Sequence, residues 1–290
     1  MSAFDQFDLE SHPKIELHVH LEGSVAADTA AELARRHGRD PADALPLVDG
    51  RYPKRFTDFQ EFINIYLAVS AQIREPGDLQ VIAEAFAQAQ AKQNIVYTET
   101  TFTAITHVRH GMDPNEMWGA VRDGLEAGGG NVGLIVDTPR DNGVEAAHRT
   151  VEMVEKADAP IVGLGLTGIE GSALEGEFRV LREAADELGL GLAVHAGETG
   201  GPERIWAALD DLGADRIGHG VASVRPRAAA PSRARGLCGT RRAVPPGRAS
   251  SAFCVARSLP RGRGTRSQRP AVAWVPGVGR RRSSPPPSLR

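Results

Sequence analysis

The chain contains little cysteine and no long apolar segment. Its 2 cysteines, Cys238 and Cys254, both lie in the last quarter of the 290 residues. The rest of the chain therefore holds neither a disulfide framework nor a thiolate metal site. No run of about 18 apolar residues occurs, so the sequence predicts no membrane-spanning helix. The N-terminal segment Met1-Ser2-Ala3-Phe4-Asp5 has no basic region and no apolar core, so we expect no signal peptide and a cytoplasmic protein.

Acidic residues and lysine are absent from residues 221–290, which contain 16 arginines. The whole chain has 34 basic and 37 acidic residues, so residues 1–220 hold the other 18 basic residues and all 37 acidic ones. Their net charge is therefore −19, which the overall value of −3 conceals. This contrast predicts two regions, an enzyme-like domain over residues 1–221 and a basic tail over residues 222–290.

The basic tail shows neither helical nor strand periodicity. Its Arg, Pro, Gly and Ser content, as in Arg280-Arg281-Arg282-Ser283-Ser284-Pro285, predicts a disordered Arg/Pro-rich segment. Such a tail is able to bind RNA or DNA through phosphate contacts. The same residue types are also what a GC-rich gene encodes in a wrong reading frame. We therefore favour a frameshift just after Gly220 or Val221 over a functional nucleic-acid-binding tail.

Short apolar segments recur between helical patterns in the enzyme-like domain. The later ones follow one another about every 30 residues, which is typical of βα units. Gly191-Leu192-Ala193-Val194 is apolar on both faces, as in a parallel strand covered by helices on both sides. The predicted strands are residues 15–20, 94–102, 132–136, 161–166, 190–195 and 216–218. The predicted helices are residues 26–37, 56–70, 79–91, 115–127, 143–156, 174–188 and 202–210.

Four histidines lie where predicted strands end. His18 and His20 close the first strand, His195 closes the fifth, and His219 follows the sixth. Because side chains alternate along a strand, His18 and His20 face the same side and form a pair of imidazole ligands that His195 would complete. Glu198 follows this third histidine closely enough to transfer a proton beside a metal ion. The pattern predicts a metal-dependent hydrolase.

The positions of these histidines also favour one fold. Six strands with intervening helices fit either a doubly wound sheet or a (β/α)8 TIM barrel. In a barrel the carboxyl ends of all strands meet at one mouth, where active sites lie, whereas an open sheet would spread them apart. We therefore predict an α/β fold, an incomplete TIM barrel with about six of eight strands. The long segment between residues 20 and 94 predicts extra helices, either a lid over the mouth or a buttress outside the barrel.

Two other patterns receive structural interpretations. Gly163-Leu164-Gly165-Leu166-Thr167-Gly168 has the G-x-G-x-x-G spacing, but no helix opens directly after it, and the next strand ends in histidine rather than an acidic residue. We therefore do not predict a dinucleotide site. The remaining histidines are expected to be structural or at the surface, although His107 follows a strand end and is the strongest exception. They are His12, His37, His107, His110 and His148.

The motifs together resemble the adenosine deaminase family over about residues 10–221. Pro13-Lys14-Ile15-Glu16-Leu17-His18-Val19-His20-Leu21-Glu22-Gly23-Ser24 is similar to the opening strand of that family. Tyr97-Thr98-Glu99 resembles its second strand, His195-Ala196-Gly197-Glu198 its fifth, and Gly218-His219-Gly220 its sixth. A single H-x-H motif is common, but this series in this order is specific. The resemblance implies a barrel of the metal-dependent hydrolase type.

The resemblance also implies a catalytic apparatus. His18, His20 and His195 would bind one zinc ion per chain. Glu198 would protonate the purine ring nitrogen beside the amino-bearing carbon, which zinc-bound hydroxide then attacks. His219 would orient the zinc-bound water and help to deprotonate it.

Further residues would bind the substrate. By the same resemblance, the backbone N–H of Gly168 would contact the purine, Glu22 would lie near the sugar, and His20 would also line the substrate site. The expected partner is a small aminopurine or its nucleoside, with no membrane and with nucleic acid only through the tail. The predicted function is therefore that of a zinc-dependent hydrolytic deaminase of a 6-aminopurine nucleoside or a related aminopurine.

The sequence departs from the family in two ways. The family's aspartate ligand on the eighth strand has no counterpart, because no Asp or Glu follows Asp215, and strands seven and eight are missing with it. Strict adenosine deaminases carry Asp in place of Glu22, and they have another sequence in place of Gly165-Leu166-Thr167-Gly168-Ile169-Glu170. These changes resemble relatives that act on adenine, aminodeoxyfutalosine or other 6-aminopurines.

Three alternatives to the leading function stay open. One is another amidohydrolase-type enzyme with the same metal site, although no lysine ends a middle strand to support a second metal. Another is a truncated and inactive relative. The last is a non-enzymatic nucleic-acid binder that acts through the arginine-rich tail.

Overall fold

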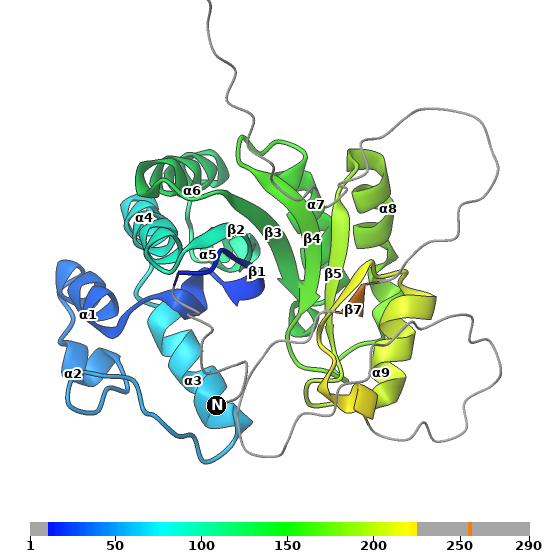
Figure 1. Cartoon of the computed structure of the whole chain (residues 1–290), viewed down its shortest axis with the longest axis horizontal. Helices are drawn as coiled ribbons and strands as arrows, with labels where there is room; N and C mark the ends of the chain where they lie inside the picture. Colours follow the sequence, from blue (N-terminus) through cyan, green and yellow to red (C-terminus); the bar gives the residue numbers. More distant parts are fainter. Residues whose placement is uncertain (1–10, 225–254, 257–290) are drawn as a thin grey trace, which may run out of the picture. The chain divides into compact units, whose positions relative to one another are not determined.

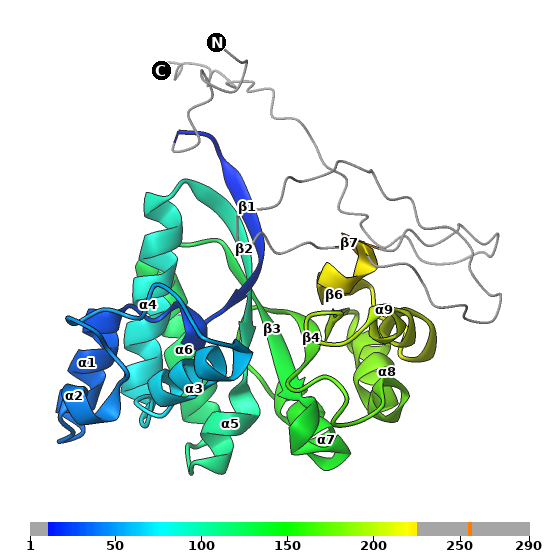
Figure 2. The same ribbon diagram turned by 90° about the horizontal axis from the view of Figure 1, so that it is seen from below.

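Six parallel strands in sequence order dominate the structure, a computed structural model that describes residues 11–224 and 255–256. A two-residue strand, β7, pairs antiparallel with β6. Figures 1 and 2 show the strands side by side, with helices along them. The strands are β1 (Lys14–His20), β2 (Ile95–Phe102), β3 (Val132–Pro139), β4 (Ile161–Thr167), β5 (Gly191–Ala196), β6 (Arg216–His219) and β7 (Val255–Ala256).

The parallel strands curve into most of a barrel. Neighbouring strands lie about 4.8 Å apart, so β2 and β6 would be separated by about 19 Å in a flat sheet. Instead, the Glu99 carboxylate on β2 forms an ion pair with the Arg216 guanidinium on β6. This contact across the interior requires a nearly closed wall. The prediction of an incomplete α/β TIM barrel with six parallel strands is confirmed.

Helices follow the strands as the sequence pattern predicts. The predicted helix over residues 174–188 begins as a 3₁₀ turn, and the one over residues 202–210 ends in a π turn. Two helices were not predicted, α2 and α5, because four and six residues are too short to show a period. The helices are α1 (Ala27–Arg36), α2 (Pro41–Ala44), α3 (Phe59–Ser70), α4 (Pro76–Lys92), α5 (Ala104–Arg109), α6 (Pro114–Gly128), α7 (Val144–Val154), α8 (Arg179–Leu188) and α9 (Pro202–Trp206). The short helical turns are η1 (Glu22–Ser24), η2 (Arg140–Asn142), η3 (Glu175–Phe178), η4 (Ala207–Asp211) and η5 (Val221–Val224).

Helix α3 lies at the carboxyl end of β1. The Tyr66 ring contacts the His20 ring at a centroid distance of 6.1 Å, and it also packs against Gly23 in η1. The helix therefore reaches the mouth of the barrel, where the predicted metal ligands lie. This position favours the lid interpretation over the outer buttress. None of the helices in the described part of the chain is long and apolar enough to cross a membrane.

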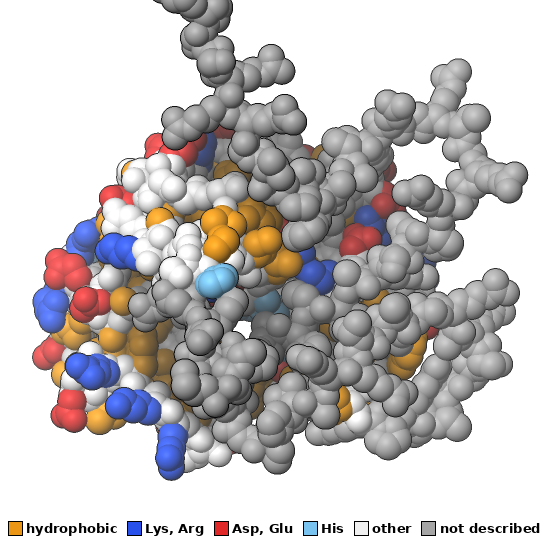
Figure 3. All heavy atoms as spheres, in the orientation of Figure 1, with side chains coloured by type: hydrophobic (Ala, Val, Ile, Leu, Met, Phe, Trp, Pro, Cys, Tyr) orange, Lys and Arg blue, Asp and Glu red, His pale blue; other side chains and the backbone are white. Residues whose placement is uncertain are grey.

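Strand β1 forms one end of the sheet. Ile15 on β1 and Val96 on β2 are 58% and 50% exposed, although both are large apolar residues. Figure 3 shows hydrophobic side chains gathered near the middle of the face that it presents. An incomplete barrel is expected to leave an open sheet edge with exposed apolar side chains, as seen here at β1 and β2.

The predicted boundary between residues 221 and 222 falls inside η5. The boundary between an enzyme-like domain and a tail stays a prediction. The predictions of a disordered, nucleic-acid-binding or frameshifted tail concern residues that, apart from 222–224 and 255–256, lie outside the described part of the chain.

Helices α4 and α6 pack closely through small residues. A Cβ atom on Gly124 would overlap the backbone oxygen of Gln80 and lie 2.8 Å from the Ala83 Cβ. A Cβ on Gly128, one turn later, would lie 2.5 Å from the Ala87 Cβ. Glycine at these two positions therefore lets the two helix backbones approach. Gly119 on the same helix has open space around it.

We predict opposite effects of alanine at two glycines of α6. Gly124→Ala should lower the free energy of unfolding by about 1–3 kcal/mol, because the added methyl forces α4 and α6 apart. Gly119→Ala should raise it by about 0.5–1 kcal/mol, because alanine favours the helix and meets nothing. Urea denaturation followed by circular dichroism measures both changes. Equal effects of the two substitutions would contradict the close-packing account.

Candidate functional site

Four imidazole rings from three strands meet at the mouth of the barrel. The His18 ring centroid lies 4.7 Å from that of His195 and 4.4 Å from that of His219. The rings of His195 and His219 are 4.7 Å apart. The His20 ring lies 5.1 Å from His195 and 6.0 Å from His18. The curvature of the barrel thus brings together side chains of β1, β5 and β6, as the sequence-based placement at strand ends requires.

The imidazole nitrogens form a set that fits a metal ion. Ligand atoms of His18, His195 and His219 all lie within 4.8 Å of one another, whereas His20 stands beside this group. Among the described residues, no hydrogen-bond partner exists for the buried His18 Nδ1. A buried polar atom without a partner is costly, and a metal ion or water would relieve that cost. Imidazole nitrogen is a preferred zinc donor, so the residues present fit zinc. The set of His18, His20 and His195 stays a prediction.

Burial keeps these imidazoles neutral. Burial is the largest cause and the charge of neighbouring imidazoles adds to it, and together they lower the pKa of His18 to about 3 and the pKa of His219 to about 4. Burial also lowers the pKa of His20 and His195. Since metal binding requires an unprotonated nitrogen, the cluster is ready to bind a cation at neutral pH.

Steric contacts explain why glycine precedes His219 in the Gly218-His219-Gly220 motif. A Cβ atom on Gly218 would lie 2.7 Å from His195 Cδ2 and 2.9 Å from His18 Cε1, so only glycine leaves room for both rings. The next residue, His219, has a φ of +65°, in the left-handed region that L-residues other than glycine rarely adopt. The backbone therefore turns sharply at the end of β6 and brings the His219 ring back to the other imidazoles.

Glu198 lies in the turn after β5, beside the imidazole cluster. One of its carboxylate oxygens is 3.4 Å from His219 Nε2. Burial, helped by the negative charge of Glu170, raises the pKa of Glu198 to about 7. A carboxyl group with this pKa is partly protonated at neutral pH, so it is suited to general acid catalysis.

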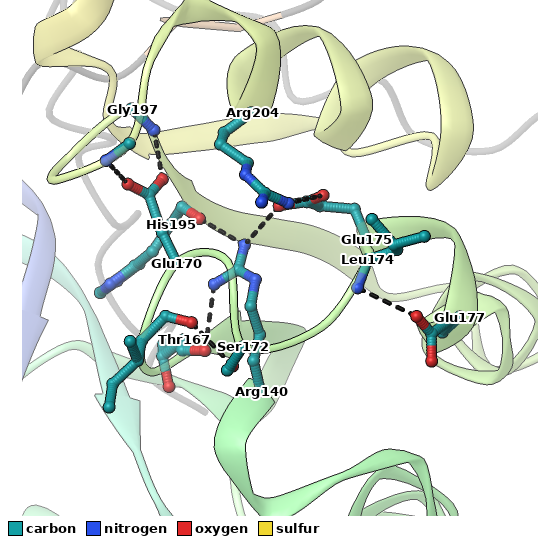
Figure 4. Close-up of polar contacts among 12 residues, drawn as sticks. Arg140, Thr167, Glu170, Ser172, Leu174, Glu175, Glu177, His195, Gly197 and Arg204 are labelled. Atoms are coloured by element: carbon teal, nitrogen blue, oxygen red, sulfur yellow. Dashed lines mark hydrogen bonds and ion pairs between the residues drawn. The ribbon is translucent and has the colours of Figure 1, made fainter.

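A carboxylate from the loop after β4 accepts hydrogen bonds from the backbone of this turn. Glu170, in the loop after β4, accepts hydrogen bonds from the backbone N–H groups of Gly197, Thr199 and Gly200. Figure 4 shows the Glu170 carboxylate turned towards Gly197. The sequence analysis gave Glu170 no role of its own and named it only within the segment of residues 165–170, and nothing there indicated this contact.

A buried arginine joins the carboxyl ends of β4 and β5. Arg140 is 1% exposed and donates to the backbone oxygens of Thr167, at 3.0 Å, and His195, at 2.6 Å. Its guanidinium also lies 3.6 Å from Glu175, whose other oxygen is 3.3 Å from Arg204 (Figure 4). Arg140 thus fixes the backbone of a predicted metal ligand. Sequence reasoning missed it.

Glu22, in η1 directly after β1, is buried. One oxygen accepts a hydrogen bond from the Thr103 N–H at 3.0 Å and lies 3.1 Å from His107 Nε2. Its other oxygen has no hydrogen-bond partner within the described part of the chain. His107, on α5, is therefore a buried structural partner of Glu22. Glu22 as a substrate-binding residue stays a prediction.

Two further residues lie at the carboxyl ends of β3 and β4. Asp137 is fully buried and accepts a hydrogen bond from the Thr167 hydroxyl. Burial raises its pKa to about 7. The predicted third strand stopped one residue before Asp137, so the end-of-strand rule that found the histidines was not applied to it. Gly168 follows β4 with a φ of +79°, and a Cβ there would lie 2.8 Å from the Arg140 backbone nitrogen.

Comparison with known proteins identifies the family to which the chain belongs. The model of the adenosine deaminase family matches residues 13–231. This chain belongs to the adenosine deaminase family. The matched residues include the four histidines of the cluster, Glu198 and the loop after β4.

Individual relatives agree with this membership. The chain is 36% identical over 222 residues to the aminodeoxyfutalosine deaminase of Streptomyces coelicolor, covering 73% of this chain and 57% of the relative. It is 35% identical over 219 residues to the adenine deaminase of the same organism, covering 73% and 63%. The solved structure of adenine deaminase from Arthrobacter aurescens is 29% identical, with a TM-score of 0.65 and coverage of 74% and 66%. This deaminase-family chain thus spans about 57–63% of the length of these two curated relatives.

We predict that Asp137→Asn stabilises the protein only at higher pH. The folded-state pKa of about 7 lies above the ordinary value of 3.8, so the folded protein pays for the carboxylate charge as pH rises between these values. The difference in unfolding free energy, variant minus wild type, should grow by about 2.5 kcal/mol between pH 5 and pH 7.5. Urea denaturation across this range measures it, with Asp43→Asn, on exposed α2, as the control for a lost carboxylate. A difference that shrinks with pH would refute this electrostatic account.

Proposed function

We propose that this chain carries the zinc-binding part of a hydrolytic aminopurine deaminase. The observation that carries the proposal is the cluster of four neutral imidazoles beside Glu198, whose carboxyl has a pKa of about 7. A Lewis-acid site next to a partly protonated acid is suited to hydrolysis at a carbon that must lose an amino group. The family supports the same chemistry, and the relatives' names support an aminopurine substrate.

The zinc ion would be held by His18, His20 and His195. When bound, zinc supplies the Lewis acidity that activates water for attack. His18 offers its unpaired Nδ1, and Arg140 fixes His195 through its backbone oxygen. His219, which is as close to His18 and His195 as they are to each other, would take and return a proton at its ring nitrogen.

The purine would lie between the imidazole cluster and the β4 loop. Glu198 would donate its proton to the ring nitrogen beside the amino-bearing carbon, which makes that carbon more electrophilic. The Gly168 N–H would hold the purine in place. Glu22 would accept a hydrogen bond from the part of the substrate that points towards β1, through the oxygen that has no partner among the described residues.

The donor set predicts weak catalysis by this exact chain. No Asp or Glu follows Asp215, so no carboxylate from the end of the chain joins the imidazoles. By the resemblance to the family, the site therefore lacks one expected protein ligand of the zinc ion. We therefore expect measurable zinc binding and slow turnover. The cytoplasmic location stays a prediction, as does the nucleic-acid-binding alternative.

Zinc should stabilise the folded protein through the imidazole cluster. At a free zinc concentration of 100 times its dissociation constant, the free energy of unfolding should rise by about 2.7 kcal/mol. Thermal melts with and without zinc and a chelator measure the shift. His195→Ala should remove most of it, whereas His148→Ala, on an exposed position of α7, should keep it. Equal zinc responses of the two variants would exclude the site.

Deamination should depend on the acidic form of Glu198. Glu198→Gln should lower kcat by at least about 10²-fold, because glutamine cannot donate the proton. The rate of the unsubstituted chain should fall as pH rises above about 7, where Glu198 loses that proton. Ultraviolet absorbance and ammonia release with adenine and adenosine measure turnover. Glu187→Gln, exposed on α8, is the matched control.

Two outcomes would contradict the proposal. One is a zinc-loaded chain that is inert towards every aminopurine. The other is a Glu198→Gln variant that retains full turnover and binds zinc normally.

A further inference from the structure

We propose that Glu170 is a positioning residue that holds Glu198 in its catalytic orientation. This role rests on the proposed deaminase function. Both carboxylate oxygens of Glu170 are used by the turn that contains Glu198, residues 197–200. One oxygen accepts from the Gly197 N–H, and the other accepts from the N–H groups of Thr199, at 2.8 Å, and Gly200. The Thr199 hydroxyl adds a contact of 3.3 Å.

These bonds lie on both sides of Glu198 in the sequence. Backbone N–H groups that converge on one negative charge form a strong anion-binding arrangement, and each such bond is charge-assisted. The residue between the bound amides has little freedom to rotate its backbone. The Glu198 side chain is therefore held in a fixed direction, with its carboxylate 3.4 Å from His219.

The glycines of the turn fit this carboxylate. A Cβ on Gly200 would lie 2.9 Å from Glu170 Oε2, which would push the carboxylate away. Gly197 has a φ of +68°, and a Cβ there would lie 2.6 Å from the Ile205 side chain. Glycine at these positions therefore leaves room for the turn to close around Glu170. The motif His195-Ala196-Gly197-Glu198-Thr199-Gly200 and Glu170 act as one unit.

The same contacts direct the Glu170 carboxylate at the backbone of residues 197–200. Both of its oxygens accept backbone N–H groups there. Glu170 is also two residues after Gly168, the predicted purine contact. The β4 loop thus carries both that contact and the anchor of the predicted acid, and its own backbone is held by Asp141, which accepts from the Ile169 N–H at 3.3 Å.

Hydrogen exchange tests the contact directly. Glu170→Gln replaces one acceptor oxygen by an NH₂ group that faces backbone donors, so the amides of residues 197, 199 and 200 should exchange about tenfold faster or more. Glu177→Gln is the matched control, because Glu177 also accepts a backbone N–H, that of Leu174 at 3.1 Å. It should leave exchange in the turn unchanged. Unchanged exchange in Glu170→Gln would overturn the proposal.

Kinetics separate positioning from a purely structural role. Glu170→Gln should lower kcat about tenfold or more with little change in KM, because substrate binding does not require an oriented acid. Glu170→Asp, which keeps the charge, should restore part of kcat. The zinc-induced shift in melting temperature should stay as in the unsubstituted chain. Faster exchange without a loss of kcat would show that Glu170 only supports the fold, and would overturn the proposal.

The hydrogen-exchange and kinetic experiments also distinguish failure of this proposal from failure of the proposed function. An unsubstituted, zinc-loaded chain without turnover contradicts the deaminase function and, with it, the catalytic meaning of Glu170. The exchange measurement still decides in that case whether Glu170 holds the turn. If the unsubstituted chain turns over and Glu170→Gln has the same kcat, the positioning role is contradicted, whereas the deaminase function is not.

Discussion

The buried guanidinium of Arg140 is the interaction on which the rest of the site depends. It connects the backbone of Thr167 at the end of β4 with that of His195 at the end of β5. A charge taken out of water costs several kcal/mol unless it is paired and hydrogen-bonded, and here Glu175 and two carbonyl oxygens provide the compensation. The ends of these strands cannot separate without breaking one of these hydrogen bonds to a buried charge. The arrangement of imidazoles and acids therefore rests on a rigid base.

Burial shifts the pKa of the basic groups and the pKa of the acidic group of the site in opposite directions. Exclusion of water disfavours charge, so it lowers the pKa of His18 and His219 and raises the pKa of Glu198. The histidines become neutral ligands, and the glutamate becomes an acid with a proton to give. Neither effect needs a specific partner, because both follow from placing the groups together at a covered barrel mouth. Glu170 adds a directional contact to this general effect.

The sequence predicted the elements of this site better than their contacts. Strand periodicity located His18, His20 and His195 at carboxyl ends, and the barrel then had to bring them together. Asp137 was missed because the predicted third strand ended at residue 136, whereas the buried strand continues to Pro139. Glu170 and Arg140 could not be found, because their hydrogen bonds join residues 27 to 55 positions apart and depend on side-chain directions that no local pattern encodes. The family resemblance named the roles but not these supports.

His219 illustrates the cost of the chemistry in this fold. It is one of three residues other than glycine with a positive φ among those that the structure describes, with Asp49 and Asn94. A side chain in the left-handed region costs about 1 kcal/mol, which glycine would not incur. Selection for thermal stability alone would therefore favour glycine over this imidazole, and laboratory evolution towards a more stable scaffold would act against the site at the end of β6. Folding and reactivity compete at this single backbone position.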